Sequence, residues 1–113
     1  MSIPRSLIKQ LEQDEFMRAC CYKNCNRQLP EFHHIFIYSG RQIQEVFNIV
    51  PACKKHHDQA TPHKPNYKQE VREYFEQVAM KRMTFDDYYK YPKRNWDQHA
   101  QYLNIKSKQY GWE

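Results

Sequence analysis

The chain has 113 residues, of which 27% are charged and 40% are hydrophobic, so it forms one domain whose core is only marginally sufficient and would gain from a bound metal. Its net charge of +5 favours a polyanionic partner such as a nucleic acid, because Lys and Arg gain free energy by releasing counterions from phosphates. Residues 1–13 contain no apolar run typical of a signal peptide, and no stretch is long and apolar enough to cross a membrane, so we expect a cytoplasmic protein whose thiols stay reduced.

The first 19 residues are predicted to form an N-terminal helical segment. Pro4 lies near the start of a helix expected over residues 4–17, since proline is tolerated in the first turn. The apolar side chains expected on one side of this helix are Leu7, Ile8, Leu11 and Phe16. We expect the helix to pack against the rest of the domain.

A β-hairpin is predicted within residues 20–63. Residues 31–38 are rich in aromatic and β-branched side chains and indicate a strand, and residues 46–50 indicate the returning strand. Ser39 and Gly40 provide turn chemistry between them. Pro51 is expected to limit the second strand, because proline cannot donate a ladder hydrogen bond.

Two pairs of cysteine and histidine residues flank this predicted hairpin. The second pair is Cys53 and His56, and the first pair contains Cys25. The partner of Cys25 is either Cys21 or Cys20, and we favour Cys21 because the shorter gap allows a tighter loop. Zinc binds four such ligands in a tetrahedron, and with all four positions filled by protein the site would be structural. The spacing therefore predicts a structural Zn²⁺ site.

Helices are predicted after the second pair. A short helix starting at Lys54 cannot run past Pro62, because proline disrupts a helix interior. Residues 66–83 then have the apolar spacing of a helix with one buried face. This longer helix belongs to a C-terminal extension, residues 64–113, which we expect to be helical, basic and aromatic.

The end of that extension is expected to contain further helix and an exposed basic surface. Thr84 and Asp87 are typical of a capping box at a helix start, and Pro92 interrupts the segment that follows. Lys93 and Arg94 are candidates for contact with DNA, while the interleaved aromatic side chains are expected to pack the helices against the hairpin region.

A set of residues between the two Cys/His pairs resembles the motif of the HNH endonuclease family, and in particular small phage-borne members whose second pair ends in His-His-Asp. The matching segments are Cys21-x-x-x-Cys25, His33-His34-Ile35, Asn48-Ile49-Val50-Pro51 and Cys53-x-x-His56-His57-Asp58. The resemblance covers about forty residues. It implies an α+β fold with a small ββα-metal finger (treble-clef-like) over residues 20–63, stapled by zinc and flanked by helices.

The resemblance also implies an activity, hydrolysis of DNA phosphodiester bonds to 5′-phosphate and 3′-hydroxyl ends. His34 would be the general base, since a histidine can accept a proton at neutral pH. His57, together with His33, would hold a catalytic Mg²⁺ or Mn²⁺ ion, and Asn48 would brace the hairpin loop. Some relatives carry a further metal-binding histidine where this chain has Thr61, so His63 either reaches the metal from a loop or is simply exposed.

Double-stranded DNA is therefore the expected partner, contacted by Lys54 and Lys55 as well as by Lys93 and Arg94. Two alternatives to an enzyme stay open. One is a non-catalytic zinc module that binds nucleic acid, and the other is an adaptor in a phage or other DNA-processing complex. The pair His33-His34, then Asn48, then His57 occur together in the order of the motif. This favours an enzyme over the two alternatives.

Overall fold

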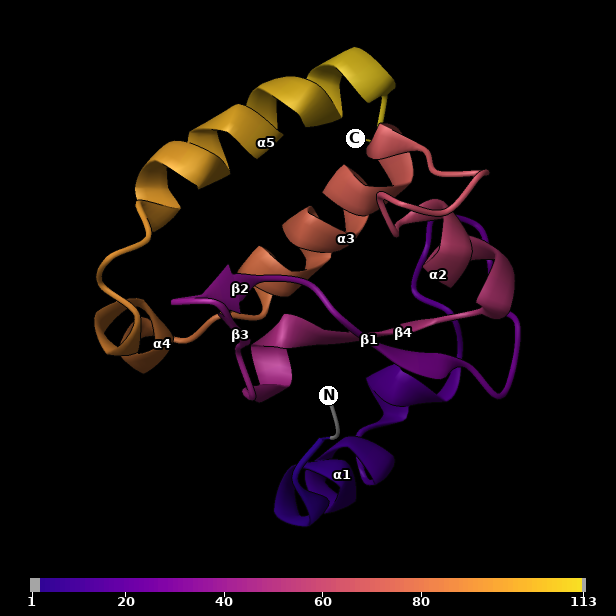
Figure 1. Ribbon diagram of the computed structural model, residues 1–113. Helices are drawn as coiled ribbons and strands as arrows, with labels where there is room; N and C mark the ends of the chain where they lie inside the picture. The colour runs from indigo at the N-terminus through magenta and orange to yellow at the C-terminus, as the bar shows by residue number, and fades with distance from the viewer. Residues whose placement is uncertain (1–2, 113) are drawn as a thin grey trace.

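The computed structural model describes residues 3–112 and has an α+β architecture with two small antiparallel sheets (Figure 1). Met1, Ser2 and Glu113, which belong to the predicted terminal segments, lie outside the described residues. The helices are α1 (Arg5–Glu12), α2 (Lys54–Gln59), α3 (Gln69–Lys81), α4 (Phe85–Lys90) and α5 (Trp96–Tyr110). The strands are β1 (Glu31–His34), β2 (Ile37–Tyr38), β3 (Arg41–Gln42) and β4 (Ile49–Ala52). Two 3₁₀ turns, η1 (Glu15–Arg18) and η2 (Val46–Asn48), complete the chain.

The N-terminal helix is shorter than the predicted residues 4–17. It ends at Glu12, and Asp14 starts the separate turn η1 by accepting a hydrogen bond from the Phe16 amide at 3.0 Å. Asp caps a new turn in this way because its side chain competes with the helical hydrogen-bond ladder. The predicted packing role is confirmed, since Leu7 and Leu11 are buried against Ile49 of β4.

The hairpin differs from the prediction in how its strands are divided. β1 pairs antiparallel with β4, with His33 opposite Val50, while β2 pairs with β3 in a separate sheet. The predicted strand over 31–38 therefore breaks after His34, and the expected turn at Ser39 and Gly40 joins β2 to β3 with positive φ angles of 53° and 79°.

Pro51 does not limit the returning strand, as was predicted, but lies inside β4. Each sheet has only two strands, so a residue without an N–H is tolerated at the open edge. The Pro51 carbonyl instead accepts a hydrogen bond from the Cys21 amide at 3.0 Å. This bond joins the segment before β1, which contains Cys21, to β4.

The predicted C-terminal helices are present with adjusted bounds. Thr84 and Asp87 form the expected capping box at the start of α4, and the chain breaks around Pro92 before α5 begins. α3 lies between α5 and the β1–β4 sheet (Figure 1). Within residues 3–112, no helix combines the length and the apolar character that a membrane span requires.

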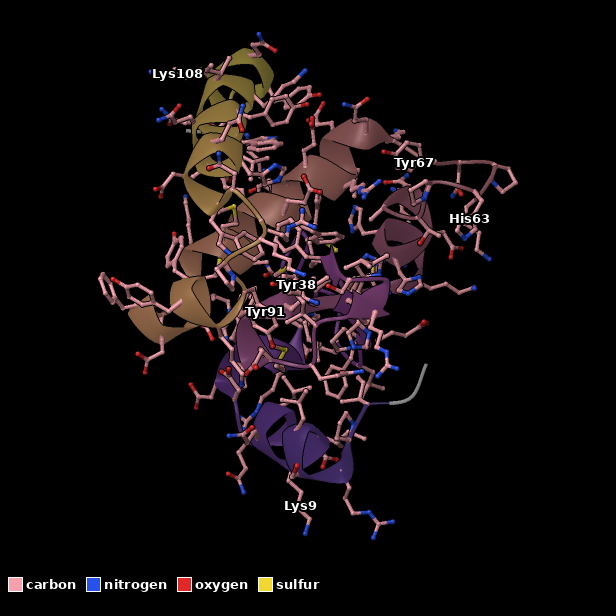
Figure 2. All side chains as sticks on the ribbon, turned by 60° about the vertical axis from the view of Figure 1, so that its left-hand side comes forward. Lys9, Tyr38, His63, Tyr67, Tyr91 and Lys108 are labelled. Atoms are coloured by element: carbon pink, nitrogen blue, oxygen red, sulfur yellow. The ribbon has the colours of Figure 1, made fainter. Side chains whose placement is uncertain are left out.

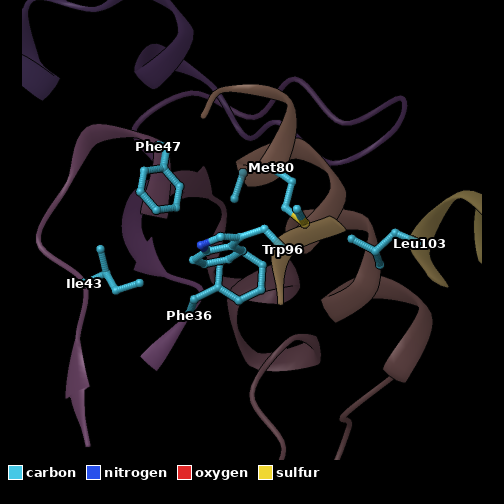
Figure 3. Packing of buried hydrophobic residues seen from close by; sticks show 7 residues of the cluster. Phe36, Ile43, Phe47, Met80, Trp96 and Leu103 are labelled. Carbon is cyan, nitrogen blue, oxygen red and sulfur yellow. The ribbon is translucent and has the colours of Figure 1, made fainter. Parts of the chain in front are cut away.

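An aromatic cluster joins the hairpin region to the C-terminal helices. Trp96, at the start of α5, is 4% exposed and lies at the centre of the cluster in Figure 3. The other buried members are Phe36, Ile43, Phe47, Ala79, Met80 and Leu103. Burying one such large apolar side chain stabilises a fold by about 1.5–3 kcal/mol, so this cluster fixes the loop after β1 against α3 and α5.

Candidate metal centre and the adjoining histidines

Three cysteines and one histidine converge beside the β1–β4 sheet. The Sγ atoms of Cys20, Cys25 and Cys53 and a ring nitrogen of His56 all lie within 4.8 Å of one another. His56 Nδ1 is 3.2 Å from Cys53 Sγ and 3.4 Å from Cys20 Sγ, and the Sγ atoms of Cys25 and Cys53 are 4.0 Å apart. Ligands about 2.0–2.3 Å from a tetrahedral zinc ion lie roughly 3.3–3.8 Å apart. The group is thus able to hold a structural metal such as zinc.

The cysteine that converges with Cys25, Cys53 and His56 is Cys20, and not Cys21 as the shorter gap had favoured. The Cys20 amide donates to the Arg27 carbonyl at 3.0 Å, next to a bridge between Ala19 and Gln28 that holds the segment extended. Successive side chains of extended backbone point to opposite sides. Cys20 consequently faces Cys25, and Cys21 packs against the apolar cluster around Val50 and Phe75. Burial raises the pKa of Cys21 to about 12, so this thiol stays protonated.

The second pair of ligands is set by the start of α2. Cys53 precedes the helix and His56 lies in its first turn, so a separation of three residues places both side chains on one side. Tyr22 stacks on His56, with ring centroids 4.4 Å apart. Burial lowers the pKa of His56, which favours the neutral imidazole that a metal requires.

A second pair of histidines lies between β1 and α2. The rings of His33 and His57 meet edge to face with centroids 4.6 Å apart, and His33 also lies near Phe75 on α3. Burial, followed by the charges of His57, His34 and Arg72, lowers the pKa of His33 to about 3. His33 is therefore a neutral imidazole at physiological pH, as a metal ligand must be.

Asp58 also belongs to this region, although it was not among the predicted site residues. Its carboxylate oxygens lie 3.8 Å from His57 Nδ1 and 3.8 Å from Lys54 Nζ. The sequence signal was its position directly after His57 in the His-His-Asp run. Asp58 thus adds a carboxylate beside the His57 imidazole, and carboxylate oxygens are donors of the kind that divalent cations accept.

His34, the next residue on β1, has a different partner. Its Nε2 lies 2.9 Å from Oε1 of Gln44, which belongs to the segment between β3 and η2. Gln44 was also absent from the predicted site. His34 and Gln44 are ten positions apart, with the β2–β3 hairpin between them, and no local sequence pattern indicates their contact.

Asn48 is fully buried and hydrogen bonds across the loop that follows β1. Its Oδ1 accepts from the Phe36 amide at 2.6 Å, and its Nδ2 donates to the carbonyls of Phe36 at 3.0 Å and Ile43 at 2.9 Å. These three bonds close the loop that contains the β2–β3 hairpin. The bracing of the hairpin loop expected for Asn48 is present in the structure.

The remaining predicted residues are more dispersed. His63 is exposed on the loop between α2 and α3, which projects from the molecule in Figure 2. Lys54 and Lys55 are exposed on α2, and Lys93 is exposed before α5. Arg94 instead donates to the Ile37 carbonyl at 2.8 Å, with its guanidinium over the rings of Phe36 and Trp96. Arg94 thus has a structural role that its charge did not predict.

The two groups of side chains have different chemical capacities. The Cys₃His group could fill all four positions of a tetrahedral metal ion, which would leave none for a substrate. His33 contacts His57, and Asp58 lies beside His57, but among the described residues these three donors do not converge into a group of the Cys₃His kind. No protein-family model, no curated protein and no solved structure matches this chain significantly.

Proposed function

We propose that this protein is a metal-dependent DNA endonuclease of the HNH type, with β1, β4 and α2 as its ββα-metal finger. The observation that carries the proposal is the contact between His33 on β1 and His57 on α2 at a centroid distance of 4.6 Å, with His34 next on the same strand. The contact joins β1 and α2, the two elements that hold the histidines of the motif, and α2 also carries His56 of the separate Cys₃His group.

In the proposed mechanism these side chains have different tasks. His57 and His33, assisted by Asp58, would hold a Mg²⁺ or Mn²⁺ ion, which would neutralise charge on the scissile phosphate and the leaving oxygen. His34 would accept a proton from water as the water oxygen attacks phosphorus, and the bond between phosphorus and the 3′ oxygen would break. Protonation of that oxygen from solvent would give the 3′-hydroxyl, with the 5′-phosphate on the other fragment. Asn48 would keep the loop after β1 closed and His34 in place.

The Cys₃His group would have a structural task in the same mechanism. A zinc ion there would join the segment before β1 to the start of α2, because Cys20 and Cys25 come from the former and Cys53 and His56 from the latter. It would thereby fix the angle at which α2 presents His57, without taking part in bond cleavage.

Charge supports DNA as the substrate. The chain carries +5, and Lys54, Lys55 and Lys93 are exposed. We propose double-stranded DNA cut with low intrinsic sequence specificity, since phosphate contacts position a protein without distinguishing bases.

The test is cleavage of supercoiled plasmid with Mg²⁺ or Mn²⁺ by the wild type and by His34→Ala, prepared with equal zinc content. Lys9→Ala, an exposed substitution on α1 (Figure 2), controls for contaminating nuclease. We expect cutting by the wild type and Lys9→Ala, and a loss of about 100-fold or more in His34→Ala with DNA affinity nearly unchanged.

Other outcomes discriminate the alternatives. Equal cutting by all three proteins would mean contamination or a wrongly assigned base. Absence of cutting with DNA still bound would favour the non-catalytic zinc module. Absence of both cutting and binding would favour the adaptor, whose partner would then be sought among DNA-processing proteins.

A further inference from the structure

The His34 ring is hydrogen bonded to the side chain of Gln44, with 2.9 Å between Gln44 Oε1 and His34 Nε2. Among residues 3–112, no other side chain is hydrogen bonded to this ring. An amide oxygen has no hydrogen to give, so in this bond Nε2 must carry the hydrogen and donate it. A neutral imidazole has a single N–H, and the lone pair is then on Nδ1. The bond therefore selects one of the two ring tautomers.

The backbone on both sides of Gln44 is anchored. Before it, the Ile43 carbonyl accepts from Asn48 Nδ2 at 2.9 Å, and the Ile43 side chain is buried in the cluster around Trp96. After it, the Glu45 carboxylate accepts from Tyr91 Oη at 2.7 Å and pairs with Lys90 Nζ at 2.5 Å. Gln44 is thus presented to His34 from a fixed segment.

These contacts connect Asn48 to His34 through two steps. Asn48 donates a hydrogen bond to the Ile43 carbonyl, and Gln44, the next residue, is hydrogen bonded to the His34 ring. His34 lies at the end of β1, where the loop closed by Asn48 begins. The closed loop therefore positions the imidazole at its ring nitrogen as well as through the backbone. A partner of this kind fixes ring orientation and tautomer, and its loss typically costs about 10- to 100-fold in activity.

We propose that Gln44 is the positioning residue of His34: it holds the Nε2–H tautomer and leaves Nδ1 as the nitrogen that accepts the proton. The catalytic consequence rests on the proposed function, whereas the tautomer itself does not. Gln44 would not touch the substrate; it would act only through the His34 ring.

The experiment is ring-¹⁵N NMR on the zinc-loaded full chain at a pH where the imidazole is neutral. Two-bond ¹H–¹⁵N correlations distinguish the two tautomers, and His34→Ala identifies the His34 signals. The variants are Gln44→Ala, which removes the acceptor, and Gln44→Glu, which keeps an oxygen at the same reach. Gln10→Ala is the matched control, because Gln10 is exposed on α1 and lines the same surface hollow as Gln44.

We expect the Nε2–H pattern in the wild type, Gln10→Ala and Gln44→Glu, and its loss in Gln44→Ala. Plasmid cleavage by Gln44→Ala should show kcat lowered by about 10- to 100-fold with KM unchanged. An Nδ1–H pattern in the wild type, or an Nε2–H pattern that survives in Gln44→Ala, would overturn the proposal. If the wild type is inactive while the tautomer responds to Gln44→Ala, the positioning by Gln44 stands and the nuclease assignment fails.

Discussion

Tyr22 stacks on His56, with ring centroids 4.4 Å apart and ring planes 28° apart. The aromatic contacts continue from Tyr22 to Tyr74 on α3, with tilted rings at 4.9 Å, and from Tyr74 to Trp112, edge to face at 5.2 Å. Lys23 Nζ adds a hydrogen bond to the Gly111 carbonyl at 2.9 Å. The candidate metal ligand is therefore in contact, through aromatic rings, with the end of α5.

Removal of zinc is expected to loosen the end of α5. Without the metal, His56 would lose the bonds that fix its ring, and Tyr22, which is stacked on it, would lose that support. A chelator should lower the midpoint of thermal unfolding and shift the emission of Trp112 to the red. The measurement is tryptophan fluorescence during chelation, with Trp112→Phe as the control in which that part of the shift disappears. Unchanged emission and stability in a protein shown to be metal-free would contradict the coupling.

Cys20 and Cys21 should differ sharply when each is replaced by serine. Cys20→Ser removes one of the four converging ligands, so zinc content after gel filtration should fall well below one equivalent. Cys21→Ser changes only a side chain packed beside Val50 and should retain one equivalent. Zinc retained by Cys20→Ser and lost by Cys21→Ser would restore the assignment that the sequence spacing favoured.

Cys20 and Cys21 show which features of the candidate metal site could be predicted from the spacing of its residues and which could not. Spacing predicted that two ligands come from the segment before the hairpin and two from the start of α2, and the structure agrees. Which of the two adjacent cysteines, Cys20 or Cys21, faces the other three side chains depends on the side of the backbone to which its own side chain points. That is set by the bond from Cys20 to Arg27 and by the bond from Cys21 to Pro51, the second of which joins residues distant in the sequence.

Contacts between distant residues also explain the other differences. Helix periodicity, the capping box at Thr84 and the break at Pro92 are local signals, and the helices of the C-terminal extension could be predicted from them. Arg94 looks in the sequence like a free cation, but its bond to Ile37 spans 57 residues. Gln44 has no motif of its own, and only the closed loop brings it to His34.

His33 is expected to stay neutral throughout the physiological pH range. Its pKa is lowered to about 3, first by burial and then by neighbouring charge, whereas an unfolded histidine titrates near about 6.5. The folded state thus binds fewer protons, and the stability that His33 contributes should fall as the pH drops below about 6.5. Ring NMR of the zinc-loaded chain between about pH 5 and 8 should show no titration of His33. A midpoint within that range would contradict the burial of the ring.

Asn48→Ala is expected to lower the free energy of unfolding by about 2–4 kcal/mol, because it leaves the buried Phe36 amide and Ile43 carbonyl without a partner, while the Phe36 carbonyl keeps its bond from the Ile43 amide. Urea unfolding measures this loss, and Asn104→Ala, at an exposed position of α5, should stay within about 0.5 kcal/mol of the wild type.

Asn48→Asp separates the hydrogen bonds from the packing, because its carboxyl has nearly the same shape as the amide. One oxygen can still accept from the Phe36 amide, but an ionised second oxygen would face the carbonyls of Phe36 and Ile43. Burial beside two carbonyls raises the pKa of an acid, so the folded state binds more protons than the unfolded state and stability falls as the pH rises. Asn48→Asp should therefore approach the wild type at about pH 5 and lose stability toward pH 8. A difference from the wild type that does not change with pH would mean that Nδ2 contributes little to holding the loop.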